Sequence, residues 1–378
     1  MDEWTPFFLL PNLEARGVVE CDGIAALVPP YDERVKAVCS AHPNFKEFLS
    51  RFQNTFGQQI WPSVLIISPH APNSYQTIDA IASFRDLISI SVITRARALV
   101  LKYERQHQLT YSDTFSLYPW TLDKNYEYLS SHTPSGMSMH VVEQFRGQSS
   151  PEISMISLQT NGLDRPLMLA LLKRWQRRYS DRSVRWKDRA LFRSLNMANQ
   201  ALQAPGGTDT TYYDVGRSIA LWTSAFEILA HPPNANANLQ VVYELLESVN
   251  WQNAAFSARR YKTYEGRRKA TRRILPCCIY GKIYKVRNDF LHGNRVTPSR
   301  LNFRRKRGYP LGYYAACLYR MALTGVLSLA VESKRRRGAD YILNMLKNAT
   351  SPQRLIEDAI LTALIPAKSP PVTASPPP

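Results

Sequence analysis

An arginine and a histidine lie five residues apart in the segment KVRNDFLHG, which spans residues 285–293. On a helix, Arg287 and His292 are about 140° apart around the axis and about 7.5 Å apart along it, whereas Asn288 and His292 share a face. A histidine carries protons near neutral pH, and an arginine donates hydrogen bonds to phosphate oxygens. The alternatives are therefore the end of an ordinary basic helix and a set of groups that acts on a phosphate.

Cleavage of RNA is the reaction that suits these groups. The ribose 2′-OH would attack the adjacent phosphate, His292 would move a proton, and Arg287 would stabilise the charge that grows on the phosphoryl oxygens. No metal or other cofactor is expected, because the nucleophile already belongs to the substrate. The spacing suits a site shared by two chains: a two-fold axis beside the helix would bring Arg287, Asn288 and His292 of both copies into one basic cleft.

Two acidic residues are candidates to support this site. Glu227 lies on a predicted helix among small residues, where another helix could approach and Glu227 could form an ion pair that positions Arg287. A solvated carboxylate and a direct catalytic role are the alternatives for Glu227. Asp289 lies within the motif itself and is the second candidate for support.

Positive charge is concentrated in the C-terminal part of the chain. The net charge is +18; residues 1–165 hold 13 Lys/Arg against 17 Asp/Glu, and residues 166–378 hold 35 against 13. Such asymmetry favours a polyanionic partner, while a solvated basic surface is the alternative. Arginines and lysines interleaved with aromatic residues suit single-stranded RNA. The candidates for RNA binding are Arg267, Arg268, Lys269, Arg272, Arg273, Arg304, Arg305, Lys306 and Arg307.

The elements that must position these residues are helices. Apolar residues at helical spacing, with acidic or proline residues at the starts and proline or glycine after the ends, predict a bundle over residues 164–348. Its expected helices cover 164–180, 186–204, 212–231, 239–251, 277–292 and 309–337. Residues 366–378, PAKSPPVTASPPP, form a proline-rich segment that we expect to be disordered.

Residues 1–160 predict an α+β domain of unknown role. The segments 17–30, 63–69, 139–147 and 152–159 are short and rich in β-branched residues, which is typical of strands, and residues 77–106 predict one long helix. The five cysteines are scattered, and no apolar run reaches the roughly 20 residues of a membrane helix. We therefore expect a soluble, cytoplasmic protein without a membrane partner.

The motif resembles that of a known family. Arg287, Asn288 and His292 match the R-N-x-x-x-H form of the HEPN signature, and RNDFLHG after LWTSAFEILAH is most similar to the Apea-like HEPN group. The resemblance covers residues from about 164 to 348 and implies a helical bundle that dimerises through the motif helix. It also implies a metal-independent endoribonuclease that leaves a 2′,3′-cyclic phosphate, with Arg287 and His292 as the catalytic pair and Asn288 orienting them.

The family context adds expectations about partners and about alternatives. Members act in toxin–antitoxin, phage-defence or RNA-processing systems, so a neutralising or regulatory partner is expected beside RNA and a second copy of the chain. Some members bind RNA or nucleotides without cutting. A non-catalytic RNA-binding or regulatory protein is therefore the second hypothesis, and a helical scaffold whose Arg287 and His292 only stabilise the dimer is the third.

Overall fold

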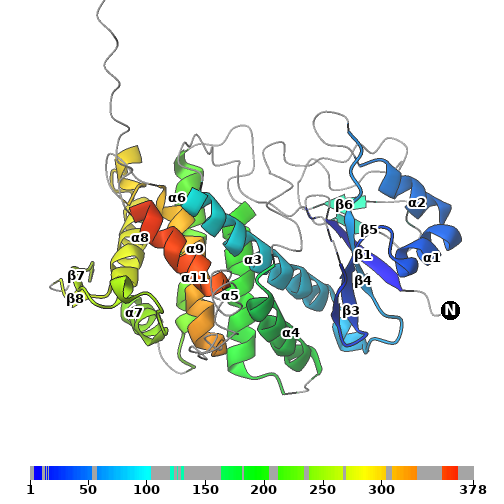
Figure 1. The fold of residues 1–378 in the computed structure, drawn as a ribbon, viewed down its shortest axis with the longest axis horizontal. Helices are drawn as coiled ribbons and strands as arrows, with labels where there is room; N and C mark the ends of the chain where they lie inside the picture. Colours follow the sequence, from blue (N-terminus) through cyan, green and yellow to red (C-terminus); the bar gives the residue numbers. More distant parts are fainter. Residues whose placement is uncertain are drawn as a thin grey trace, which may run out of the picture.

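The fold was analysed in a computed structural model of the chain. It describes residues 4–10, 13, 15, 17–52, 58–103, 120–122, 126, 129–131, 163–180, 183–203, 212–233, 238–266, 270–303, 309–329 and 351–364. The chain is mostly helical, with an antiparallel sheet built from N-terminal residues (Figure 1).

The sheet has the strand order β2-β3-β4-β1-β5-β6, and every neighbouring pair is antiparallel. Its strands are β1 (Thr5–Leu10), β2 (Val19–Cys21), β3 (Ala25–Val28), β4 (Ser63–Ile67), β5 (Trp120–Leu122) and β6 (Leu129–Ser131). The strands β2, β3 and β4 confirm the predictions for residues 17–30 and 63–69. The predicted strands at 139–147 and 152–159 lie outside the described residues.

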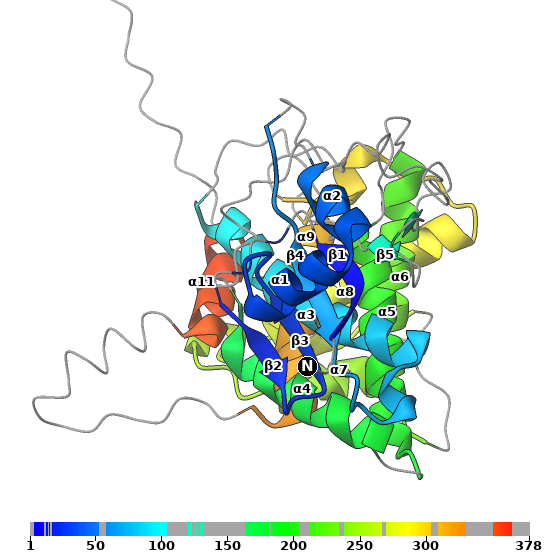
Figure 2. The same cartoon turned by 90° about the vertical axis from the view of Figure 1, so that its right-hand side faces the viewer.

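Both faces of the sheet are covered at β4, where every residue is buried. Val64 and Ile66 pack with the helices α1 (Glu33–Ala41) and α2 (Pro43–Ser50) in one apolar cluster. Leu65 and Ile67, which alternate with them, belong to a second and larger cluster that continues into the helices. Figure 2 shows α1 and α2 lying over the sheet, on the side away from the helical part.

The helical part contains the motif. Its helices are α4 (Arg165–Ser180), α5 (Trp186–Gln203), α6 (Tyr212–Ala230), α7 (Leu239–Ser248), α8 (Leu275–Leu291), α9 (Leu311–Leu327) and α11 (Pro352–Leu364). Short 3-10 turns lie at Asn73–Tyr75, Ala254–Phe256 and Pro298–Arg300, and a small hairpin pairs β7 (Tyr261–Lys262) with β8 (Arg272–Arg273). The expected acidic start of α4 is confirmed, because Asp164 Oδ1 accepts the backbone N–H of Leu167 at 3.2 Å.

The long helix α3 (Ile78–Tyr103) belongs to both parts of the protein. It confirms the helix predicted at residues 77–106, but it packs against α4, α5, α9 and α11 and shares one apolar core with them. The boundary expected between residues 160 and 164 therefore does not divide the core. Figure 1 shows α3 running from the sheet into the helical part.

Candidate functional site

The motif residues occupy the C-terminal end of α8. His292 is the first residue after the helix, and Gly293 takes a left-handed backbone conformation with a φ of +69°. The backbone N–H of Gly293 donates to the carbonyl of Phe290 at 3.3 Å, and that of Asn294 donates to the carbonyl of Asp289 at 2.8 Å. This pair of bonds is the Schellman arrangement, which ends a helix at a glycine. The arrangement leaves His292 exposed at the helix end.

Arg287 is oriented by its neighbours on the same helix. Its Nη1 donates to Asn288 Oδ1 at 2.9 Å, and its guanidinium carbon lies 5.5 Å from the centroid of the Tyr284 ring. Because Tyr284 precedes Arg287 by three residues, the guanidinium points back toward the start of α8, as helical side chains tend to do. The structure therefore brings Arg287 together with Asn288 and Tyr284, and it does not bring Arg287 to His292 within one chain.

The helix α6 runs antiparallel to α8 and packs beside it. The rings of Phe226 and Tyr280 lie 4.8 Å apart, near the end of α6 and the start of α8. At the other end, an ideal Cβ placed on Gly216 would lie 2.5 Å from Cδ1 of Phe290. The absence of a side chain at Gly216 is thus what allows the two helices to approach beside the motif.

Glu227 interacts electrostatically with this face of α8. Burial raises the pKa of Glu227 above its ordinary value, and the positive charge of Arg287 opposes that rise. No hydrogen bond or ion pair joins Glu227 to another residue in the described part of the chain. The ion pair expected between Glu227 and Arg287 is therefore an interaction at longer range in this conformation.

Two polar groups on this face are buried without hydrogen-bond partners among the described residues. They are Nε of Arg287 and the hydroxyl of Tyr280. Burial raises the pKa of Tyr280 well above its usual value, and the Glu227 carboxylate raises it further. A buried polar group without a partner is rare, because it costs free energy. Where one occurs, a ligand or a second conformation often supplies the missing hydrogen bond.

Asp289 contacts residues of the turn that follows α8. Its Oδ1 accepts a hydrogen bond from Asn294 Nδ2 at 3.2 Å, and its Oδ2 lies 3.5 Å from Nη1 of Arg300. These contacts hold the turn that follows α8. Asp289 thus supports the position of His292 through the backbone of the turn, and none of these contacts involves Arg287.

The basic candidates are placed only in part. Arg272 is exposed on β8, whereas Arg273 forms ion pairs with Glu247 at 2.8 Å and with Glu265 at 3.3 Å. Arg273 is therefore engaged within the fold. The remaining candidates lie outside the described residues: Arg267, Arg268, Lys269, Arg304, Arg305, Lys306 and Arg307.

Several residues of the site were missed by sequence reasoning. Tyr280 and Tyr284 precede Asn288 by eight and four residues, so the spacing along one helical face was an available signal. Leu291 and Tyr213 are large apolar residues with 57% and 66% of their surface exposed. They lie at the same end of the bundle, since Gly216 on the first turns of α6 contacts Phe290 beside Leu291.

Comparisons with protein-family models, with curated proteins and with solved structures found no match to this chain. Among the described residues, no helix is both long and apolar enough to cross a membrane.

Proposed function

We propose that the protein is a metal-independent endoribonuclease whose composite site forms between two copies of the chain. The observation that carries this proposal is the state of Arg287: its guanidinium is oriented by Asn288 and Tyr284, yet its buried Nε has no partner in the described residues. An oriented arginine with an unused N–H suits a phosphate oxygen. His292, exposed at the end of the same helix, is the proton carrier of the proposed reaction.

In the proposed dimer, each site combines His292 of one copy with Arg287 of the other. We place the two-fold axis beside Asn288, with the α8 helices of the two copies antiparallel. His292 then lies opposite Tyr284 of the partner subunit, because each is four residues from Asn288, and Arg287 of the partner subunit covers that tyrosine. The exposed Leu291 supports this arrangement, since a dimer would cover its side chain.

In the proposed reaction, the 2′-OH of a ribose attacks the adjacent phosphorus and the bond to the 5′-oxygen of the next nucleotide breaks. His292 moves the proton, and Arg287 of the partner subunit stabilises the charge on the phosphoryl oxygens. The products are a 2′,3′-cyclic phosphate and a 5′-hydroxyl. The motif and the helical context support membership of the Apea-like HEPN group, and a role in phage defence or as a toxin with a neutralising partner belongs to the same proposal.

A second candidate function is RNA binding without cleavage. It is favoured by the direction of the Arg287 guanidinium, which points away from His292 of the same chain. If no dimer brings the two groups together, the basic surface would still attract RNA, whereas the reaction would lack its charge-stabilising group.

The test is cleavage of end-labelled single-stranded RNA by purified protein in EDTA. Wild type should cut, and the 3′ ends should be cyclic phosphates. His292→Ala and Arg287→Ala should each lower the rate by about 10²-fold or more, as expected for the loss of a general acid–base or of a charge-stabilising donor. His70→Ala is the matched control, because His70 is exposed and lies far from α8 in the sequence; it should leave the rate unchanged.

A mixing experiment tests the shared site. His292→Ala and Arg287→Ala subunits are each inactive, but a mixed dimer regains one intact site, so mixing should restore about a quarter of the wild-type rate if the subunits exchange freely. A stable monomer that cuts at the wild-type rate would disprove the composite site. Wild-type protein that binds RNA and leaves it intact would favour the second candidate.

A further inference from the structure

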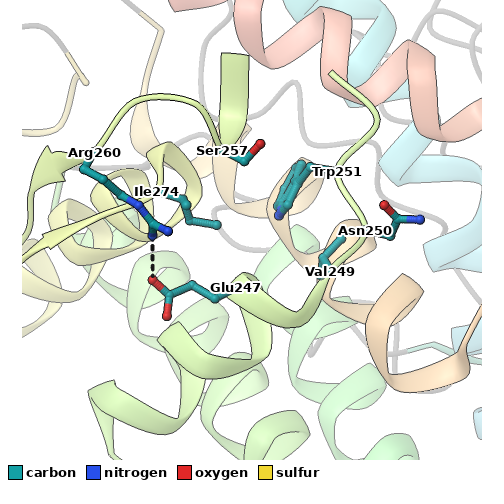
Figure 3. Close-up of a pocket in the computed structure, with 7 residues that line it drawn as sticks. All are labelled: Glu247, Val249, Asn250, Trp251, Ser257, Arg260 and Ile274. Carbon is teal, nitrogen blue, oxygen red and sulfur yellow. Dashed lines mark ion pairs between the residues drawn. The ribbon is translucent and has the colours of Figure 1, made fainter. Parts of the chain in front are cut away.

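A polar pocket of about 400 Å³ lies at the opposite end of α8 from His292. Its lining residues come from the end of α7, from the segment that follows α7 and from Ile274, which immediately precedes α8. Figure 3 shows Arg260 and Glu247 on one side of the pocket and Trp251 and Asn250 on the other. The volume falls in the range of small-molecule sites and exceeds the size of one nucleobase.

The charges around this pocket favour an anionic ligand. The described residues of 244–275 include five Lys/Arg against three Asp/Glu. Glu247, the acidic residue of the lining, already pairs with two arginines: Arg273 at 2.8 Å and Arg260 at 3.5 Å. The Arg273 side chain is 16% exposed, whereas 55% of the Arg260 side chain is exposed. An exposed ion pair at that distance is weak, so a phosphate can take Arg260 at little cost while Arg273 keeps Glu247 neutralised.

The aromatic wall is held in a fixed position. Trp251 stacks on Phe256 with ring centroids 4.6 Å apart, and its Nε1 donates to the carbonyl of Leu246 at 2.9 Å. Glu357 of α11 accepts the backbone N–H groups of Gln252 at 3.0 Å and Asn253 at 2.7 Å. The wall is therefore set before any ligand arrives, which lowers the entropic cost of binding.

We infer that this pocket binds one nucleotide of the RNA, at a distance from the cleavage site. The base lies beside Trp251, of which 9% of the surface is exposed, and its phosphate binds Arg260. Along the axis of α8, Ile274 and His292 are about 27 Å apart, so the two sites hold different nucleotides of one strand. The inference rests on the proposed function, because it requires RNA as the ligand.

Binding of a 12-nucleotide single-stranded RNA tests the inference, with 2′-O-methyl groups on the RNA to prevent cleavage and fluorescence anisotropy as the readout. Arg260→Ala should weaken binding about tenfold, the usual effect of losing one charge-assisted hydrogen bond. Arg259→Ala is the matched control: Arg259 is the exposed neighbour, its guanidinium lies over Tyr261, and it does not line the pocket. It should weaken binding by no more than about twofold. Equal losses for the two variants would overturn the inference.

A variant without a charge change gives a second test. Ser257 is exposed and lines the pocket, so Ser257→Leu fills the space of the base, whereas Ala258→Leu adds the same bulk at a neighbouring exposed position outside the lining. Ser257→Leu should weaken RNA binding by about tenfold or more, in the range of one lost base stack. If it binds as tightly as Ala258→Leu, no base enters the pocket.

The two remaining arms separate this inference from other outcomes. Cleavage of a dinucleotide, whose single phosphate occupies the cleavage site, should be equal for wild type and Arg260→Ala. Saturable binding of AMP that does not compete with RNA would assign the pocket to a free nucleotide and overturn the inference. If wild type binds RNA, responds to Arg260→Ala and never cuts, the pocket stands and the proposed nuclease activity fails; if wild type binds no RNA, both fail.

Discussion

The substitution Gly216→Ala tests how closely α6 packs against the end of α8. An added Cβ would lie 2.5, 2.7 and 2.8 Å from three ring carbons of Phe290, whereas carbon atoms in favourable contact are about 3.5–4.0 Å apart. The ring therefore has to move by about 1 Å, and it belongs to a residue on the last turn of α8. Overpacking of this kind costs about 1–3 kcal/mol, and the helical preference of alanine over glycine returns about 0.5–1 kcal/mol. We expect a net loss of about 0.5–2 kcal/mol.

A second glycine in a helix gives the matched control. A Cβ on Gly325 of α9 would lie 3.4 Å from Cγ2 of Val249, which is an ordinary contact. Gly325→Ala should therefore stabilise the protein by a few tenths to about 1 kcal/mol, so the two substitutions have opposite signs.

The assay is urea unfolding followed by circular dichroism, with the slopes compared to verify that the same transition is observed. A smaller side chain at the contact, in the double variant Gly216→Ala/Phe290→Leu, should recover part of the loss that Gly216→Ala causes. If Gly216→Ala stabilises the protein as much as Gly325→Ala does, Phe290 does not lie against α6, and the position assigned to the end of α8 is wrong.

Two further substitutions test the charges within the bundle. Arg320→Met should lower the free energy of unfolding by about 3–5 kcal/mol, because it leaves the fully buried Asp164 carboxylate without its partner at 2.6 Å. Thermal unfolding of Arg320→Met, with and without Asp164→Asn, measures the loss of stability. A loss that Asp164→Asn does not reduce would contradict the prediction. Glu227→Gln tests the burial that raises the pKa of Glu227. The stability that this raised pKa gives wild type is present below the ordinary value of 4.5 and is lost as the pH rises through the folded-state pKa. Glu227→Gln should therefore unfold at a higher urea concentration than wild type at neutral pH, and at a similar concentration near pH 4. A pH-independent difference would show that burial of the charge is not the cause.

Local signals in the sequence predict the helices of the motif region well. The apolar spacing places α4 to α9, Asp164 marks a helix start, and Gly293 marks the end of α8, because each of these residues satisfies backbone groups that a helix end leaves unpaired. The elements α1, α2 and α11 were missed although similar signals exist for them. Asp32 caps α1 and Pro43 begins α2, while α11 lies just before the proline-rich segment, whose composition is typical of disorder.

Contacts between distant elements could not be predicted in the same way. The helix α3 has apolar residues on most of its surface, which indicates burial without indicating by what, and its partners include α11, more than 240 residues later in the chain. The same limit applies to the site. Spacing shows that Tyr284 and Arg287 share a helical face, but only the packing of α6 shows that Glu227 lies close enough to act on both.

The two proposed sites constrain each other through α8. If the two-fold axis lies beside Asn288, each His292 is about 6 Å from the axis along the helix, and each pocket, at the level of Ile274, is about 21 Å from it. The two cleavage sites then lie close together at the centre of the dimer, and the two nucleotide pockets flank them on opposite sides. A strand anchored in one pocket therefore approaches the centre at a fixed distance from its anchor, so the position of the cut relative to the bound nucleotide is set by the length of the helix. Arg260→Ala should accordingly relax where a long RNA is cut, while the chemistry at His292 is unchanged.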